Sequence, residues 1–237
     1  MLPFKEINLE ENTFIREFKQ DTDSGEFVWH RDRENRVVES IGETDWMIQI
    51  DNEFKKLYCK NNLITSFEGL EGTNVEILDC SNNKISSLNG MPLVSGHGSI
   101  IVHSNQLTSL NGLKLPNVID IDSFRINASF NKITTLQGSN LSSIESMYSF
   151  QLQGNPLKSI EGCPPMIGSL NLSFTDLESL KGGPKIVGYL YLMGVPNFKT
   201  LDGFPQRADV LYVDRNFAFN DDDIKDYCRV KDIRRTI

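Results

Sequence analysis

The sequence lacks a long apolar run. Its uninterrupted aliphatic stretches are only a few residues long, as at residues 100–102, whereas a membrane-spanning helix needs about 20. The opening residues, MLPFKEINLEENTF, also lack the basic and then apolar segments of a secretory signal peptide. We therefore expect a cytoplasmic protein that does not associate with a membrane.

Basic residues are too few for a general nucleic-acid-binding surface. The chain has 24 Lys and Arg against 32 Asp and Glu, a net charge of −8, whereas nucleic-acid-binding proteins usually carry a basic face. Residues 1–56 alone hold eight basic and fourteen acidic residues, a net −6. The P-loop, Gly-x-Ser-x-Gly and strand-linked Gly-x-Gly-x-x-Gly motifs are also missing. The sequence therefore predicts no enzyme and no cofactor.

Asparagine, by contrast, is abundant, with 21 Asn beside 24 Leu, and its excess follows an internal repeat. An apolar-x-apolar-x-x-Asn segment recurs eight times within residues 57–216, at intervals of 20 to 26 residues. An apolar-x-x-apolar-x-Gly segment follows in the first seven copies, as at Ile85, Leu88 and Gly90. The Asn position is held in order by Asn62, Asn83, Asn105, Asn131, Asn155, Thr175, Val195 and Asn216.

This pattern resembles the leucine-rich repeat, whose copies of about 20–29 residues combine Leu-x-Leu with a following Asn or Cys. The resemblance implies a leucine-rich-repeat solenoid of short parallel β-strands, with few helices on its convex side. Alternate apolar residues of each strand would point inward, and the Asn side chains would bond the turns as a ladder. Thr175 and Val195 interrupt the ladder, which is expected to be weaker from residue 175 to 197.

The four cysteines include no Cys-x-x-Cys pair, which argues against a zinc site. They are expected to be thiols in a reducing compartment. Cys59 and Cys80 occupy the same inward position in adjacent repeats, whose strands would lie about 4.8 Å apart. We expect this pair to be two buried thiols that pack as small hydrophobic groups rather than a disulfide or a metal site.

The two ends of the chain differ from the repeats, and caps there would cover the core of the terminal repeats. Residues 1–56 are expected to form an N-terminal β-hairpin block with strands at 27–30 and 36–39 and a third at 45–51. Residues 217–237 are expected to form a capping helix, since three Asp at 221–223 favour its N-terminus and basic residues up to Arg235 its C-terminal half. Ile224, Tyr227 and Cys228 would face the last repeat.

Residues 26–53 resemble the opening strands of small cupin-like proteins of tailed phages. Turns such as Ser-Ile-Glu-Gly-Cys-Pro at 159–164 are similar in style to repeat proteins of large phage genomes. The resemblance implies a phage protein in the host cytoplasm, and it leaves a metal-dependent cupin-like activity as an alternative. His30 and Asp32 form a His-x-Asp pair of the kind such a site uses, but the other histidines, His97 and His103, lie within the repeats. No metal ligand is therefore assigned.

The concave sheet face is the expected partner-binding surface. Its middle carries amide and serine side chains, and its C-terminal part gathers tyrosine and methionine, which are enriched at the cores of interfaces. The alternative is that the C-terminal cap covers these aromatic side chains. The candidate partner-binding residues are Tyr58, Asp79, Ile101, His103, Asn127, Gln151, Asn171, Tyr189, Tyr191, Met193 and Tyr212.

These features predict a non-catalytic protein–protein interaction module whose partner is a protein, such as a host factor that it binds or inhibits. Neither the partner nor the oligomeric state follows from the sequence. One alternative is a virion structural or assembly protein in which the repeats form a rigid spacer. Another is an inhibitor that presents the acidic N-terminal block to a basic groove on its target.

Overall fold

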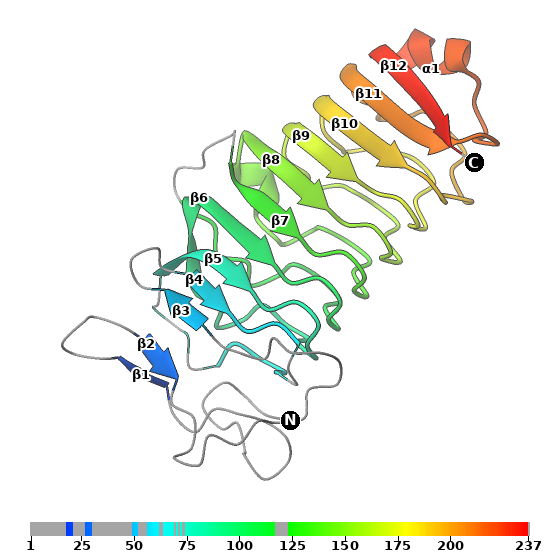
Figure 1. Ribbon diagram of the computed structural model, residues 1–237. Helices are drawn as coiled ribbons and strands as arrows, with labels where there is room; N and C mark the ends of the chain where they lie inside the picture. The colour runs from blue at the N-terminus through cyan, green and yellow to red at the C-terminus, as the bar shows by residue number, and fades with distance from the viewer. Residues whose placement is uncertain are drawn as a thin grey trace.

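The structure is a computed structural model that describes residues 18–20, 27–29, 49–51, 56–61, 64–68, 70, 72, 74–116 and 123–236. Within these ranges the chain forms a parallel β-solenoid of about eight turns with few helices (Figure 1). The coarse prediction of a repeat solenoid is therefore confirmed.

One sheet of ten strands runs the length of the solenoid in the order β12 to β3, so that neighbours in sequence are neighbours in space. All neighbours from β4 to β12 pair in parallel, and β3 pairs antiparallel with β4. The strands are β3 Gln49–Asp51, β4 Lys56–Tyr58, β5 Asn74–Asp79, β6 Leu93–Ile101, β7 Arg125–Asn127, β8 Ser146–Gln151, β9 Met166–Asn171, β10 Ile186–Leu192, β11 Arg207–Asp214 and β12 Arg229–Thr236.

The apolar positions of the repeat stack in register to form the core. The first apolar position forms a continuous row whose members are each at most 2% exposed: Leu57, Leu78, Ile100, Ile126, Phe150, Leu170, Leu190 and Leu211. A residue two positions later in each repeat is also buried, because successive side chains of a strand point to opposite sides. The period-2 pattern thus determines which side chains enter the core.

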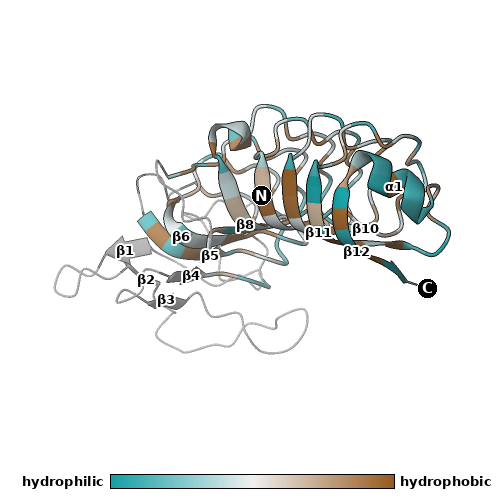
Figure 2. Ribbon diagram, turned by 90° about the horizontal axis from the view of Figure 1, so that it is seen from above, coloured by the Kyte–Doolittle hydropathy of each residue, from teal (hydrophilic) through white to brown (hydrophobic). Residues whose placement is uncertain are grey.

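The segments that return from one strand to the next lie on the other side of the core from the sheet (Figure 2). Their own apolar pairs, such as Ile85 and Leu88, are fully buried against the strand residues. In the described part of these segments the regular structure is limited to a 3-10 turn, η3 at Leu141–Ser143, and the short helix α1 at Asp221–Tyr227 between β11 and β12. No helix among the described residues is long and apolar enough to cross a membrane.

Buried asparagines connect adjacent turns of the solenoid. Asn131 is typical: its Oδ1 accepts a hydrogen bond from the Leu107 backbone N–H (3.0 Å). Its Nδ2 donates to the carbonyl oxygens of Val102, Ala128 and Ser129 at 3.0, 3.1 and 3.2 Å. The predicted ladder is therefore confirmed over its central members, which are Asn83, Asn105, Asn131 and Asn155.

The ladder is interrupted after Asn155, in the region from 175 to 197 where the sequence predicts it to be weaker. The Thr175 hydroxyl donates to the Leu172 carbonyl oxygen at 2.7 Å, within its own repeat, and Val195 has no polar side-chain atom. Asn216 was expected to continue the ladder, and this prediction is wrong: its side chain is exposed and makes no hydrogen bond within the described residues.

The cysteines differ from their prediction. Cys59 and Cys80 form a disulfide between adjacent repeats, with 4.8 Å between their Cα atoms, so the prediction of two separate thiols is wrong. The parallel register brings these equivalent positions within the Cα separation that disulfides require. Cys163 and Cys228 are free and buried. Burial raises the pKa of Cys163 to about 12 and that of Cys228 to about 11, so both thiols stay protonated at neutral pH.

The structure describes only part of the predicted N-terminal hairpin block. Strand β2, Phe27–Trp29, pairs antiparallel with β1, Phe18–Gln20, in a separate two-stranded sheet. The predicted partner at 36–39 lies outside the described residues. The predicted third strand at 45–51 is present as β3 over its last three residues.

The C-terminal segment is a short helix followed by a strand, so the prediction of one helix through Arg235 is wrong. Helix α1 covers Asp221–Tyr227, and β12 continues the parallel sheet beyond β11. Ile224 and Cys228 are buried as predicted, whereas Tyr227 is 61% exposed. The basic residues expected on a helix lie on β12 because this strand satisfies the backbone groups of β11.

The start of α1 carries a capping box, and its contribution to the free energy of unfolding can be measured. The Asn220 side chain accepts hydrogen bonds from the backbone N–H groups of Asp222 (2.9 Å) and Asp223 (3.0 Å), and Asp223 Oδ2 accepts one from the Asn220 N–H. Asn220→Ala is expected to lower the free energy of unfolding by about 1 kcal/mol. Urea denaturation would measure this, with Asn197→Ala as the control, because Asn197 is exposed and its backbone is not in the left-handed region. Equal loss in both variants would contradict a role for the cap.

Candidate functional site

The predicted partner-binding residues follow one continuous row across the sheet. The parallel register pairs each member with the next, from β4 to β11: Tyr58, Asp79, Ile101, Asn127, Gln151, Asn171, Tyr191 and Tyr212. All are half-buried. His103 and Met193 lie just beyond the strand ends and are half-buried, and Tyr189 lies on β10 with 47% of its surface exposed. The structure thus brings the predicted residues onto one face.

The middle of this face is polar and held by its own hydrogen bonds. Asn127 Oδ1 accepts from the Ser129 hydroxyl at 2.7 Å and from its backbone N–H at 3.2 Å. Asp79 makes the same pair of bonds with Ser81, at 2.6 and 3.1 Å. Part of the hydrogen-bonding capacity of these side chains is therefore already satisfied within the sheet. They form a preorganised polar surface.

The C-terminal part of the face carries an aromatic stack. The Tyr191 and Tyr212 rings are stacked, with centroids 4.4 Å apart and an interplanar angle of 7°. The Arg234 guanidinium lies 5.4 Å from the centre of the Tyr212 ring, and its Nη1 donates to the Tyr212 hydroxyl at 2.8 Å. Tyr191, Tyr212 and Arg234 occupy equivalent positions on adjacent strands. We call these three residues with Tyr189 the tyrosine patch.

Burial, and next the charge of Tyr212 when ionised, raise the pKa of Tyr191 above its usual value. The Tyr191 phenol therefore stays protonated at neutral pH and can act as a hydrogen-bond donor. Strand β12 extends the sheet beside the tyrosine patch and α1 does not cover Tyr189, which remains 47% exposed. The alternative that the C-terminal segment buries the aromatic residues is therefore wrong for Tyr189.

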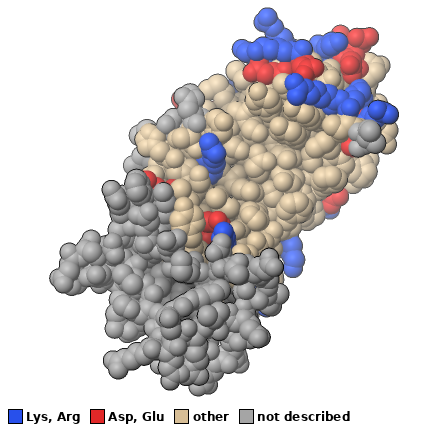
Figure 3. Space-filling model, viewed as in Figure 1, with Lys and Arg blue, Asp and Glu red and all other residues tan. Residues whose placement is uncertain are grey.

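Charged side chains gather at the same end of the molecule. Figure 3 shows few charges over the middle of the sheet and a mixed cluster over β11, β12 and α1. The Asp209 carboxylate forms ion pairs with Lys231 at 2.7 Å and with Arg207 at 3.3 Å. The hydrogen bond from Lys231 is the main cause that lowers the pKa of Asp209 below its usual value. These exposed pairs each contribute little stability, but they give this end a defined charge pattern. Sequence reasoning missed Arg234 and its neighbours because it placed them on a helix.

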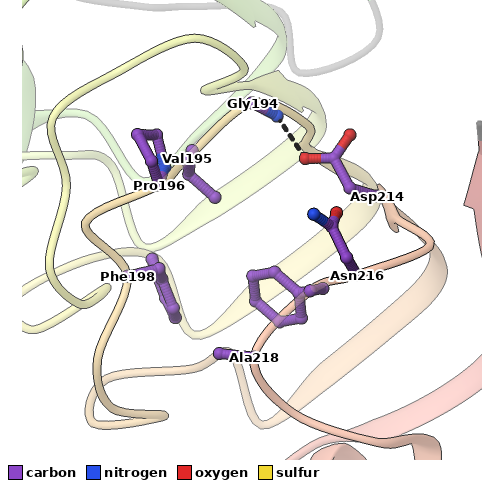
Figure 4. A pocket seen from close by; sticks show the side chains of 8 residues that line it. Gly194, Val195, Pro196, Phe198, Asp214, Asn216 and Ala218 are labelled. Atoms are coloured by element: carbon purple, nitrogen blue, oxygen red, sulfur yellow. Dashed lines mark hydrogen bonds between the residues drawn. The ribbon is translucent and has the colours of Figure 1, made fainter.

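A pocket lies at the C-terminal ends of β10 and β11, where the Asn ladder has ended (Figure 4). Its volume is about 550 Å³, within the usual range for small-ligand sites. It is formed by the turn after β10 and the turn after β11, and its lining residues are Gly194, Val195, Pro196, Phe198, Asp214, Asn216, Phe217 and Ala218. The signal that could have indicated it in the sequence is the departure from Asn at residue 195.

The metal-site alternative on the N-terminal block rests on His30 and Asp32. His30 and Asp32 lie outside the described residues. Among the residues that are described, no group of three or more His, Cys, Asp or Glu is placed to hold a metal ion. His103 Nδ1 lies 3.1 Å from the hydroxyl of the adjacent Ser104, so this contact of the His103 side chain is with its neighbour in the sequence.

Comparison with known proteins adds no family assignment. No family model matches the chain, no curated protein is significantly similar to it, and no solved structure matches its fold.

Proposed function

We propose that this chain is a leucine-rich-repeat interaction protein that binds a protein partner on the solvent face of its parallel sheet, without catalysis of its own. The observation that carries the proposal is the tyrosine patch. Tyrosine is enriched in the buried cores of protein–protein interfaces, because its ring offers a large rigid apolar surface and its hydroxyl can form a hydrogen bond. Arginine, which lies beside Tyr212 here, is also enriched among the residues that contribute most to binding energy.

The packing of the sheet supports the proposal. The strand side chains beneath the face are buried at 0–2% exposure in the register rows of the core, so the face is rigid before any partner arrives. A preorganised surface loses little conformational entropy on binding. The proposed placement in a host cytoplasm, and the phage origin, rest on the sequence resemblance alone.

The tyrosine patch is tested by affinity capture with immobilised protein, followed by a binding titration of the recovered partner. Tyr191→Ala/Tyr212→Ala is expected to weaken binding by about 30-fold or more, the effect of losing one hot spot of about 2 kcal/mol. The matched control is Tyr227→Ala, an equally large exposed tyrosine on α1, away from the sheet face. If the double variant keeps every partner at full affinity, the patch is not the binding site.

The middle of the face should contribute less. Asn127→Ala and Gln151→Ala remove side chains that are already bonded within the sheet, so each is expected to change the affinity by less than about fivefold. The same titration measures this. A loss at these positions larger than that at the tyrosines would move the site to the centre of the sheet.

A further inference from the structure

The pocket after β10 and β11 has an unusual combination of walls. Phe198 and Val195 are 5% and 6% exposed and form an apolar wall. The Phe198 and Phe217 ring centres lie 5.4 Å apart, which extends the apolar wall across both turns. A pocket of this kind favours a ligand with a flat or aliphatic body.

Two of the lining residues have polar side chains, Asp214 and Asn216. Asp214 Oδ2 accepts a hydrogen bond from the Gly194 backbone N–H at 2.6 Å, which fixes the carboxylate at the edge of the pocket (Figure 4). Within the described part of the chain Asp214 has no basic partner, in contrast to Asp209, Asp221 and Asp232 nearby. The Asn216 side chain lies beside it and also has no hydrogen-bond partner there.

The pocket coincides with a break in the repeat. In the central repeats an asparagine side chain accepts from the backbone of the preceding turn and so joins the two turns. Val195 cannot make this bond, and Asn216 does not make it. Both residues line the pocket, so the departure from the repeat pattern coincides with it. Positions at which a regular sequence breaks its own repeat pattern are often functional sites.

We propose that this pocket binds a planar cation, a guanidinium or amidinium group, carried on an apolar body. The Asp214 carboxylate would pair with the cation, since such pairs are strong when the geometry is bidentate or well fixed. The amide oxygen of Asn216 would accept a further N–H, and Phe198, Phe217 and Val195 would contact the apolar body. Two sources share this chemistry: an arginine side chain of a protein, and a free aromatic amidine or guanidine.

The test uses the full chain and two probes, benzamidine and N-acetyl-arginine amide, titrated while backbone amide signals are followed by NMR. Benzamidine is expected to bind with a Kd on the order of 1 mM, reasonable for a fragment of its size, and to shift the Gly194 amide signal. Asp214→Asn is expected to weaken binding at least tenfold. This substitution keeps an acceptor for the Gly194 N–H, so the pocket geometry is retained while the charge is lost.

Asp209→Asn is the matched control, because that carboxylate is already paired with Lys231 and Arg207, and it should leave probe binding unchanged. Neutral benzamide should bind at least tenfold more weakly than benzamidine. Binding of N-acetyl-arginine amide with the same Asp214 dependence supports an arginine side chain as the ligand, and binding of benzamidine alone supports a free aromatic amidine. The proposal is overturned if neither probe binds, or if Asp214→Asn binds as well as the wild type. Neither outcome depends on whether the tyrosine patch binds a protein.

Discussion

Phe150→Ala is expected to lower the free energy of unfolding by about 3–5 kcal/mol, the range for removing a buried aromatic ring. Phe150 is fully buried on β8, in the middle of the first core row, with Ile126 and Leu170 as its register partners. The cavity would therefore open between two adjacent turns at the centre of the solenoid. Surrounding side chains relax only partly into such a cavity because they are held by stacked strands.

Equilibrium urea denaturation followed by far-UV circular dichroism measures this effect. Phe174→Ala is the matched control, since the same ring is lost from a side chain that is 62% exposed; a loss of about 1 kcal/mol or less is expected there. A solenoid is a chain of nearest-neighbour interfaces, so the variant should also show a smaller denaturant dependence if the two halves unfold separately. A loss below about 1 kcal/mol for Phe150→Ala would contradict this description of the core.

Asn131→Ala is expected to lower the free energy of unfolding by about 3 kcal/mol, although it removes only a few atoms. The substitution leaves the Leu107 N–H without its acceptor and removes the donor shared by three carbonyl oxygens. Each buried polar group left without a partner costs about 1–3 kcal/mol. The expected loss of stability is smaller than the sum over all four groups, because a carbonyl oxygen has two lone pairs and can accept a hydrogen bond from another donor.

Two variants separate hydrogen bonding from side-chain volume. Asn131→Asp keeps an acceptor for the Leu107 N–H but turns a carboxylate toward the carbonyl oxygens, so it should be at least as destabilising as Asn131→Ala. Asn216→Ala removes the equivalent side chain of the last repeat, which is exposed and makes no described hydrogen bond, and should change the stability by less than about 0.5 kcal/mol. Chemical denaturation gives all three values. Equal losses for Asn131→Ala and Asn216→Ala would show that the ladder does not stabilise the fold.

The candidate site followed from the sequence only in part. The row from Tyr58 to Tyr212 could be predicted because the alternation of side chains along each strand and the stacking of the repeats together determine which residues share a face. The contribution of Arg234 could not, since its place beside Tyr212 depends on a pairing between β11 and β12. Local charge favours a helix over those residues, whereas the unpaired backbone groups of β11 favour a strand.

The sequence by itself determined the repeat, the inward rows of the core, the central turn asparagines and the order of the repeat strands β4 to β11, because each of these follows from a short pattern repeated at a nearly constant interval. The tertiary structure decided the features that depend on two adjacent turns at once. These are the disulfide of Cys59 with Cys80, the exposure of Asn216 and the pocket beside Asp214. Each of these depends on how the side chains of two neighbouring turns meet, which a pattern within one repeat does not contain.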